Sequence, residues 1–322
     1  GTSDRFTITY KELYKDVKPG GFILVNDGQV ELLVDHVEGE DIVCVCANDG
    51  VVKNKRGINV PGIKLGFDYL SPKDTADITF GCEQGVNFIA ASFVRRAQDV
   101  LDVKKLLIEN GRPEIQIIAK IENSEGVENM DEILKVADGI MVARGDLGVE
   151  IPAEDVPLIQ KELINKCRAA GKIVITATQM LDSMQENPRP TRAEVSDVAN
   201  AIYDGTDAIM LSGESAQGKY PEEAVMTMTK IALKTEETLD YASLLRKAIR
   251  TAPEDPSEAI CMSVAEIASK FKVSAIVVYT ESGSTAKRVS RYRPESMVIA
   301  ATPYEPVTRS LALNWGVKGV VC

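Results

Sequence analysis

The strongest constraint on the fold is a change of pattern near residue 67, where short apolar runs begin to alternate with helical stretches. Helix start signals follow these runs, such as Ser124 with Glu128, Thr191 with Glu194, and Pro221. Strands that are apolar almost throughout are typical of a parallel sheet covered on both faces. The predicted strands are residues 87–93, 115–122, 139–143, 172–178 and 208–212.

This alternation is compatible with an open doubly wound sheet or with a (β/α)₈ TIM barrel. Only five βα units are visible, and five strands do not close an eight-stranded barrel. Either the sheet is open or three units precede the chain. The sequence begins without Met on a β-rich segment, which favours truncation.

The segments on either side have different patterns. Residues 1–66 contain short β-branched runs separated by turns, which predicts a small antiparallel β-barrel or sandwich. Residues 239–322 alternate helices with three short strands and end on a strand, which predicts a partial α/β layer domain. We therefore expect domains at 1–66, 67–238 (the barrel) and 239–322.

Composition excludes several classes of function. The net charge of −11 argues against nucleic acid as the main partner. No apolar run approaches the ~20 residues that span a bilayer, so no membrane role is expected. The first residues are polar, and the six cysteines form no Cys-x-x-Cys, which favours reduced thiols and a cytoplasmic protein.

The chain has one histidine, His36, which we interpret as a polar residue of a β-ribbon. A Ser-His-Asp triad or a histidine zinc site would depend on it alone. The search for chemistry therefore turns to carboxylates, lysines and metals with oxygen ligands.

Polar residues gather at the predicted strand ends. Lys120 and Glu122 share one face of their strand, because side chains alternate with period two. Asp146 follows the next strand and Thr178 the one after, while Ser92 ends the strand before. In parallel α/β folds the carboxyl ends of the strands bear the active site.

Glu122 and Asp146 suit Mg²⁺ or Mn²⁺, which take hard oxygen ligands. Gly145 lets backbone N–H groups approach an anion, and a short helix is expected to begin at Asp146. Lys120 could stabilise a developing enolate or a transferring phosphoryl group. The alternative is a structural Lys–Glu pair. Arg144 is expected to pair with Glu214 or another acid as scaffold.

At these residues the sequence resembles the pyruvate kinases, and the likeness extends from Gly1 to Cys322. Its most specific stretches are residues 119–123, 140–148, 177–181, 188–194 and 210–214. The resemblance implies a glycolytic enzyme that transfers phosphate from phosphoenolpyruvate to ADP, giving pyruvate and ATP.

The resemblance also implies roles for individual residues. Lys120 resembles the transition-state stabiliser, and Thr178 is grouped with it as catalytic. Glu122 and Asp146 resemble the metal ligands. Contacts to the substrate are implied for Lys120, Gly145, Asp146, Thr178 and Ser92. Arg56 is similar to a nucleotide-contacting Lys and keeps its charge but not its geometry.

Residues 1–66 resemble part of a lid that closes over the nucleotide. The three barrel strands that would precede it supply K⁺ ligands and a phosphate-binding Arg in the family. The last domain resembles a regulatory domain, and Thr280, Ser282, Ser284 and Thr285 resemble the loop that binds the phosphate of an allosteric effector. An ordinary Ser/Gly turn would have the same sequence. A homotetramer is implied as well.

Two alternatives remain at this point. One is a metal-dependent lyase or aldolase on a pyruvate-binding barrel, which would need neither a lid nor a third domain. The other is a fragment with binding or structural value only. We expect a protein made of these residues alone to lack kinase activity, since five strands leave an apolar sheet edge unpaired.

Overall fold

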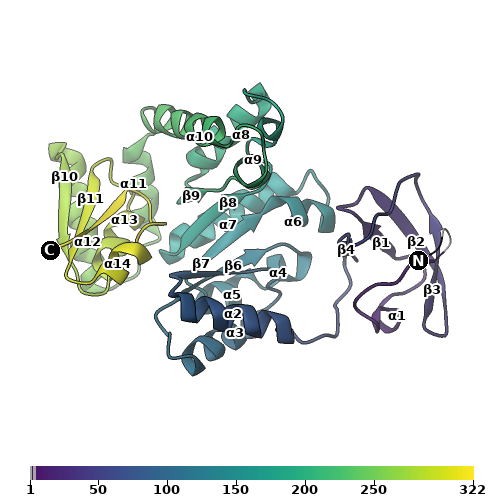
Figure 1. Cartoon of the computed structure of the whole chain (residues 1–322). Helices are drawn as coiled ribbons and strands as arrows, with labels where there is room; N and C mark the ends of the chain where they lie inside the picture. Colours follow the sequence, from purple (N-terminus) through teal and green to yellow (C-terminus); the bar gives the residue numbers. More distant parts are fainter. Residues whose placement is uncertain (1, 3–4) are drawn as a thin grey trace.

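The chain folds into three separate sheets that follow one another along the sequence (Figure 1). The computed structural model describes residue 2 and residues 5–322. The first sheet is antiparallel with strand order β3-β2-β1-β4. The second is parallel with order β5-β6-β7-β8-β9, and the third is parallel with order β10-β11-β12. No described helix has the length and apolarity needed to cross a bilayer.

The N-terminal sheet confirms the predicted β pattern. Its elements are α1 (Leu13–Asp16), β1 (Phe22–Val25), β2 (Val30–Glu38), β3 (Asp41–Cys46) and β4 (Ile58–Asn59). Residues 26–29 form the turn that joins β1 to β2, and Asn26, Asp27 and Gly28 have positive φ, a conformation that Asn, Asp and Gly adopt more readily than other residues. The sheet has its own apolar core. His36 lies in β2 as expected and is exposed.

The central sheet confirms the five predicted strands and their sequential parallel order. The strands are β5 (Phe88–Ala91), β6 (Gln116–Ile121), β7 (Gly139–Ala143), β8 (Ile173–Ala177) and β9 (Ala208–Ile209). Its helices are α2 (Pro72–Gln84), α3 (Ala97–Glu109), α4 (Ser124–Glu128), α5 (Met130–Val136), α6 (Arg144–Glu150), α7 (Val156–Ala170), η1 (Asp182–Gln185), α8 (Arg192–Asp204), α9 (Gly213–Ala216) and α10 (Pro221–Glu236).

The two faces of this sheet have different neighbours. Ile121 belongs to the large core that the sheet shares with the surrounding helices. Ile118 belongs to a second cluster on the opposite face, together with Met141 and Ile175. Alternate residues of β6 therefore point in opposite directions, as the period-two argument predicted.

Helix starts were predicted with mixed success. Thr191 caps α8 and forms a capping box with Glu194, as expected. The prediction for Ser124 was wrong by one residue: Asn123 caps α4 by accepting a hydrogen bond from the Gly126 N–H at 2.7 Å. Asn is as good a cap as Ser, so the local pattern did not distinguish the two positions.

The C-terminal sheet lies beside two helices that the chain forms after α10. Its elements are α11 (Tyr241–Arg250), α12 (Pro256–Phe271), β10 (Ala275–Tyr279), α13 (Ser284–Arg291), β11 (Met297–Thr302), α14 (Glu305–Ser310) and β12 (Val317–Val321). A buried ion pair joins this part to the segment that leads into β9. Arg293 pairs with Asp207 at 2.8 Å, and Arg293 also stacks on Trp315. Such a buried pair fixes the geometry of the junction.

Candidate functional site

Lys120 is at the centre of the polar cluster at the strand ends. Its ammonium Nζ lies 2.8 Å from Ser92 Oγ and 2.9 Å from Glu122 Oε1. Ser92 follows β5, Lys120 is the last residue but one of β6, and Glu122 comes directly after that strand. The structure therefore brings these three predicted residues together, and 22% of the Lys120 side chain remains exposed to an incoming ligand.

Glu122 is fully buried, with 0% of its surface exposed. Its Oε2 accepts a hydrogen bond of 2.6 Å from the Phe93 N–H. Burial raises the pKa of this carboxyl, the Lys120 charge lowers it, and the nearby Asp146 charge raises it further. The other oxygen, Oε1, faces the Lys120 ammonium at 2.9 Å. A cation bound at this carboxylate would therefore lie beside Lys120.

Asp146 lies in the first turn of α6, which begins at Arg144 rather than at Asp146 as predicted. The helix thus includes the whole segment Arg144-Gly145-Asp146. Gly145 also differs from the expectation, because its N–H already donates to Thr178 Oγ1 at 2.7 Å. That N–H holds Thr178 in place instead of pointing into open space.

Thr178 and Gln179 follow β8 with positive φ angles of 69° and 52°. Phe93, after β5, also has a positive φ of 52°. Non-glycine residues rarely adopt this conformation, and it is found at functional sites where the surroundings enforce it. Sequence reasoning missed these three conformations, since no Gly or Asn marks them.

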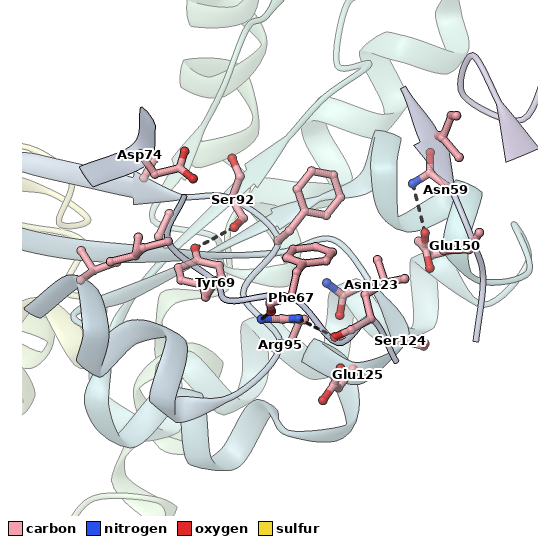
Figure 2. A pocket seen from close by; sticks show the side chains of 18 of the residues that line it. Asn59, Phe67, Tyr69, Asp74, Ser92, Arg95, Asn123, Ser124, Glu125 and Glu150 are labelled. Carbon is pink, nitrogen blue, oxygen red and sulfur yellow. Dashed lines mark hydrogen bonds between the residues drawn. The ribbon is translucent and has the colours of Figure 1, made fainter. Parts of the chain in front are cut away.

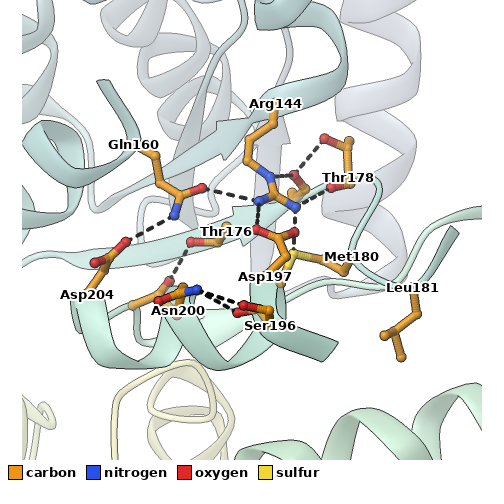
Figure 3. A network of polar contacts seen from close by, with 12 residues as sticks. Arg144, Gln160, Thr176, Thr178, Met180, Leu181, Ser196, Asp197, Asn200 and Asp204 are labelled. Atoms are coloured by element: carbon orange, nitrogen blue, oxygen red, sulfur yellow. Dashed lines mark hydrogen bonds and ion pairs between the residues drawn. The ribbon is translucent and has the colours of Figure 1, made fainter. Parts of the chain in front are cut away.

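Arg144 enforces the geometry after β8 (Figure 3). Its guanidinium donates to Thr178 O at 2.7 Å and to Ala177 O at 3.2 Å. The acid that pairs with it is Asp197 of α8, at 2.7 Å. This confirms the scaffold role predicted for Arg144, whose partner is another acid rather than Glu214.

Glu214 has different hydrogen-bond partners. Its carboxylate accepts hydrogen bonds from the Leu181 and Ser212 N–H groups at 3.0 and 2.7 Å. Asp197 was missed because it lies 53 residues from Arg144. The sequence contains one signal for it: Asp197 and Asp204 are seven residues apart, so they share a face of α8. On that face, Gln160 donates a hydrogen bond to Asp204 and accepts one from Arg144.

Replacing Arg144 by Lys is expected to lower the free energy of unfolding by about 2–4 kcal/mol. Lys keeps the charge but cannot reach two carbonyls and a carboxylate as the planar guanidinium does. Thr178 would then lose its tether, so turnover should fall as well. Chemical denaturation measures the first effect. Arg246→Lys, at an exposed position of α11, is the matched control, and equal stability of both variants would contradict the scaffold role.

The remaining predicted residues lie elsewhere. Arg56 is exposed in the connection between β3 and β4. In the loop before α13, Thr280 Oγ1 accepts from the Gly283 N–H at 2.9 Å, and Ser282 Oγ accepts from the Ser284 N–H at 3.4 Å. Ser284 and Thr285 are exposed. These contacts form an ordered turn before α13.

A cavity of about 500 Å³ borders the strand ends (Figure 2). Its walls include Ser92, Phe93 and Asn123 together with residues of β4 and of the segment that leads into α2. Within residue 2 and residues 5–322, no group of three or more His, Cys, Asp or Glu side chains is arranged to hold a metal ion.

Comparison with known families agrees with this geometry. The family model described as pyruvate kinase, barrel domain, matches residues 1–225. The model described as pyruvate kinase, alpha/beta domain, matches residues 258–322. The chain belongs to the pyruvate kinase family. This confirms the predicted fold class, part of a TIM barrel followed by an α/β domain.

Similar pyruvate kinases occur in several bacteria. That of Clostridium perfringens is 56% identical over the whole chain, which spans 68% of that relative. That of Clostridium acetobutylicum is 53% identical and is also covered over 68% of its length. That of Geobacillus stearothermophilus is 57% identical over 98% of this chain and 54% of the relative. Pyruvate kinases transfer phosphate from phosphoenolpyruvate to ADP in glycolysis, and the family is generally metal dependent.

Proposed function

We propose that Lys120, Glu122, Asp146 and Thr178 form the site at which this pyruvate kinase transfers phosphate. The observation that supports it most is the position of Lys120 Nζ, within 3 Å of both Ser92 Oγ and the buried Glu122 carboxylate. A cation held in a partly buried site stabilises negative charge far better than one in water. Lys120 would act where the phosphoryl group leaves and the enolate forms.

Glu122 and Asp146 would hold one divalent cation, Mg²⁺ or Mn²⁺. The fit rests on the hard oxygen donors and on the burial of Glu122. When bound, the ion would neutralise charge on the phosphate and carboxylate of the substrate. Two protein carboxylates leave most coordination positions to substrate oxygens and water, as Mg²⁺ sites in phosphotransferases do.

Thr178 and Gly145 would bind the carboxylate end of phosphoenolpyruvate, and Ser92 would contact the substrate beside Lys120. The Thr178 hydroxyl is held by the Gly145 N–H and by Ala177 O, at 2.7 and 2.6 Å. These contacts place both groups beside each other. To bind a carboxylate, which only accepts hydrogen bonds, the Thr178 hydroxyl would rotate its proton away from Ala177 O, and the Gly145 N–H would exchange its bond to Thr178 for one to the substrate.

The N-terminal sheet would act as the lid over the nucleotide, with Arg56 contacting ADP or ATP. We further propose that residues 280–285 bind a phosphorylated effector through Thr280, Ser282, Ser284 and Thr285, and that the enzyme is a cytoplasmic homotetramer that uses K⁺. These proposals rest on the family resemblance.

The test is formation of pyruvate by the full-length protein, followed with and without ADP and divalent cation. Pyruvate should form from phosphoenolpyruvate only when both are present, and chelation with EDTA should abolish it. Retro-aldol cleavage of a 2-oxo acid should be undetectable. Cleavage at a substantial rate without ADP would favour the aldolase alternative and contradict the proposal.

A further inference from the structure

The N-terminal sheet meets the barrel side through α6, the helix that bears Asp146. Asn59, in β4, donates from Nδ2 to Glu150 Oε1 at 3.0 Å (Figure 2). The turn between β1 and β2 lies against the same helix, since a carbon added at Gly28 would be 3.8 Å from Val149 Cγ1. Two separate parts of the sheet thus contact neighbouring residues at the end of α6.

The contact at Asn59 is well defined. Only 9% of Asn59 is exposed. Burial raises the pKa of Glu150, the hydrogen bond from Asn59 lowers it, and the charge of Asp146 raises it. A buried amide that donates to a partly buried carboxylate forms a stronger hydrogen bond than a surface pair, because water competes less for the two groups.

Glu150 and Asp146 are four residues apart on α6, so they lie on the same face of one helical turn. Leu147, between them, is fully buried and anchors the helix in the core. A displacement of Glu150 would therefore shift Asp146 as well, because one turn of hydrogen-bonded helix connects the two residues. Arg56, three residues before Asn59, leads into the same β segment.

We propose that Asn59 and Glu150 form a latch through which the position of the lid sets the position of Asp146. Both are positioning residues, and neither needs to touch the metal or the substrate. With the latch closed, Asp146 is held for the cation; with it open, α6 is free to tilt. The coupling is reciprocal, so a cation bound at Asp146 favours the closed lid. This inference rests on the proposed metal role of Asp146 and on the proposed lid role of the N-terminal sheet.

The test is Mn²⁺ affinity of the full-length protein, measured by calorimetry in the presence of ADP. Asn59→Ala and Glu150→Ala are each expected to weaken Mn²⁺ binding about three- to tenfold, as loss of one partly buried hydrogen bond does. The double variant should be no weaker than the worse single variant, because both remove the same contact. The Michaelis constant for ADP should rise more than turnover falls.

Two controls separate the latch from other effects. Glu150→Gln keeps an oxygen that accepts from Asn59, so it should bind Mn²⁺ nearly as the unmodified protein does. Asp41→Ala removes an exposed carboxylate of β3, which pairs with Arg5 at the edge of the sheet opposite β4, and should have no effect. Unchanged Mn²⁺ affinity in Asn59→Ala would overturn the latch. So would equal losses in Glu150→Gln and Glu150→Ala, which would assign the effect to charge.

Glu122→Gln, measured in parallel, separates failure of the latch from failure of the site. If Glu122→Gln loses Mn²⁺ and Asn59→Ala does not, the latch is wrong and the metal site stands. If Glu122→Gln also binds Mn²⁺ normally, the metal site itself is wrong and the latch fails with it.

Discussion

Replacing Lys120 by alanine is expected to lower turnover by about a thousandfold while the protein stays folded. Removal of one preorganised donor from a charge-stabilising site typically costs about 10²–10³ in rate, and Lys120 carries a full charge. The fold should persist because the Glu122 carboxyl, once Lys120 is removed, can bind a proton and become neutral. Burial already raises the pKa of this carboxyl. Steady-state kinetics of the full-length protein measures the rate, and thermal unfolding measures the fold.

The control for this prediction is Lys166→Ala. Lys166 pairs with Asp131 and Glu162 on the surface of α7, at 2.9 and 3.2 Å, and such pairs contribute little. It should leave turnover unchanged. A Lys120→Ala enzyme with normal turnover would show that the Lys120–Glu122 pair is structural.

Replacing Glu122 by glutamine is expected to weaken Mn²⁺ binding about a hundredfold or more. Glutamine has nearly the same shape and still accepts the Phe93 N–H, so the backbone after β5 should keep its conformation. The change removes the negative charge that a hard divalent cation requires. Calorimetric titration with Mn²⁺ measures the loss.

The stability of this variant separates the two roles of Glu122. A neutral side chain at this fully buried position avoids the cost of burying a charge, and Lys120, which loses its partner, keeps 22% of its side chain exposed to water. The melting temperature should therefore change little. Loss of cation affinity without loss of stability would assign Glu122 to function. A large drop in melting temperature with normal Mn²⁺ affinity would assign it to the scaffold.

Much of the site follows from local rules. Strand periodicity places Lys120 and Glu122 on one face, opposite Ile121, and the parallel sheet brings Ser92 beside them. The order of the five strands follows from their alternation with helices. These features depend only on neighbours along the chain or on the next βα unit, which is why the sequence predicts them.

Other features depend on contacts that no local pattern encodes. Asp197 pairs with Arg144 across 53 residues, and Asn59 reaches Glu150 across 91. The positive φ of Phe93 and Thr178 is enforced by hydrogen bonds to Glu122 and Arg144, respectively. The residue types Phe and Thr do not favour a positive φ, so the sequence does not predict this conformation. Tertiary contacts decided these positions against local preference.

The most direct test of the site is crystallographic. Crystals of the full-length protein grown with Mn²⁺ should show an anomalous difference peak within bonding distance of the carboxylates of both Glu122 and Asp146, with Lys120 beside it. A peak bound to neither carboxylate, or Mn²⁺ held by a different set of residues, would contradict the assignment of this strand-end cluster as the phosphoryl-transfer site.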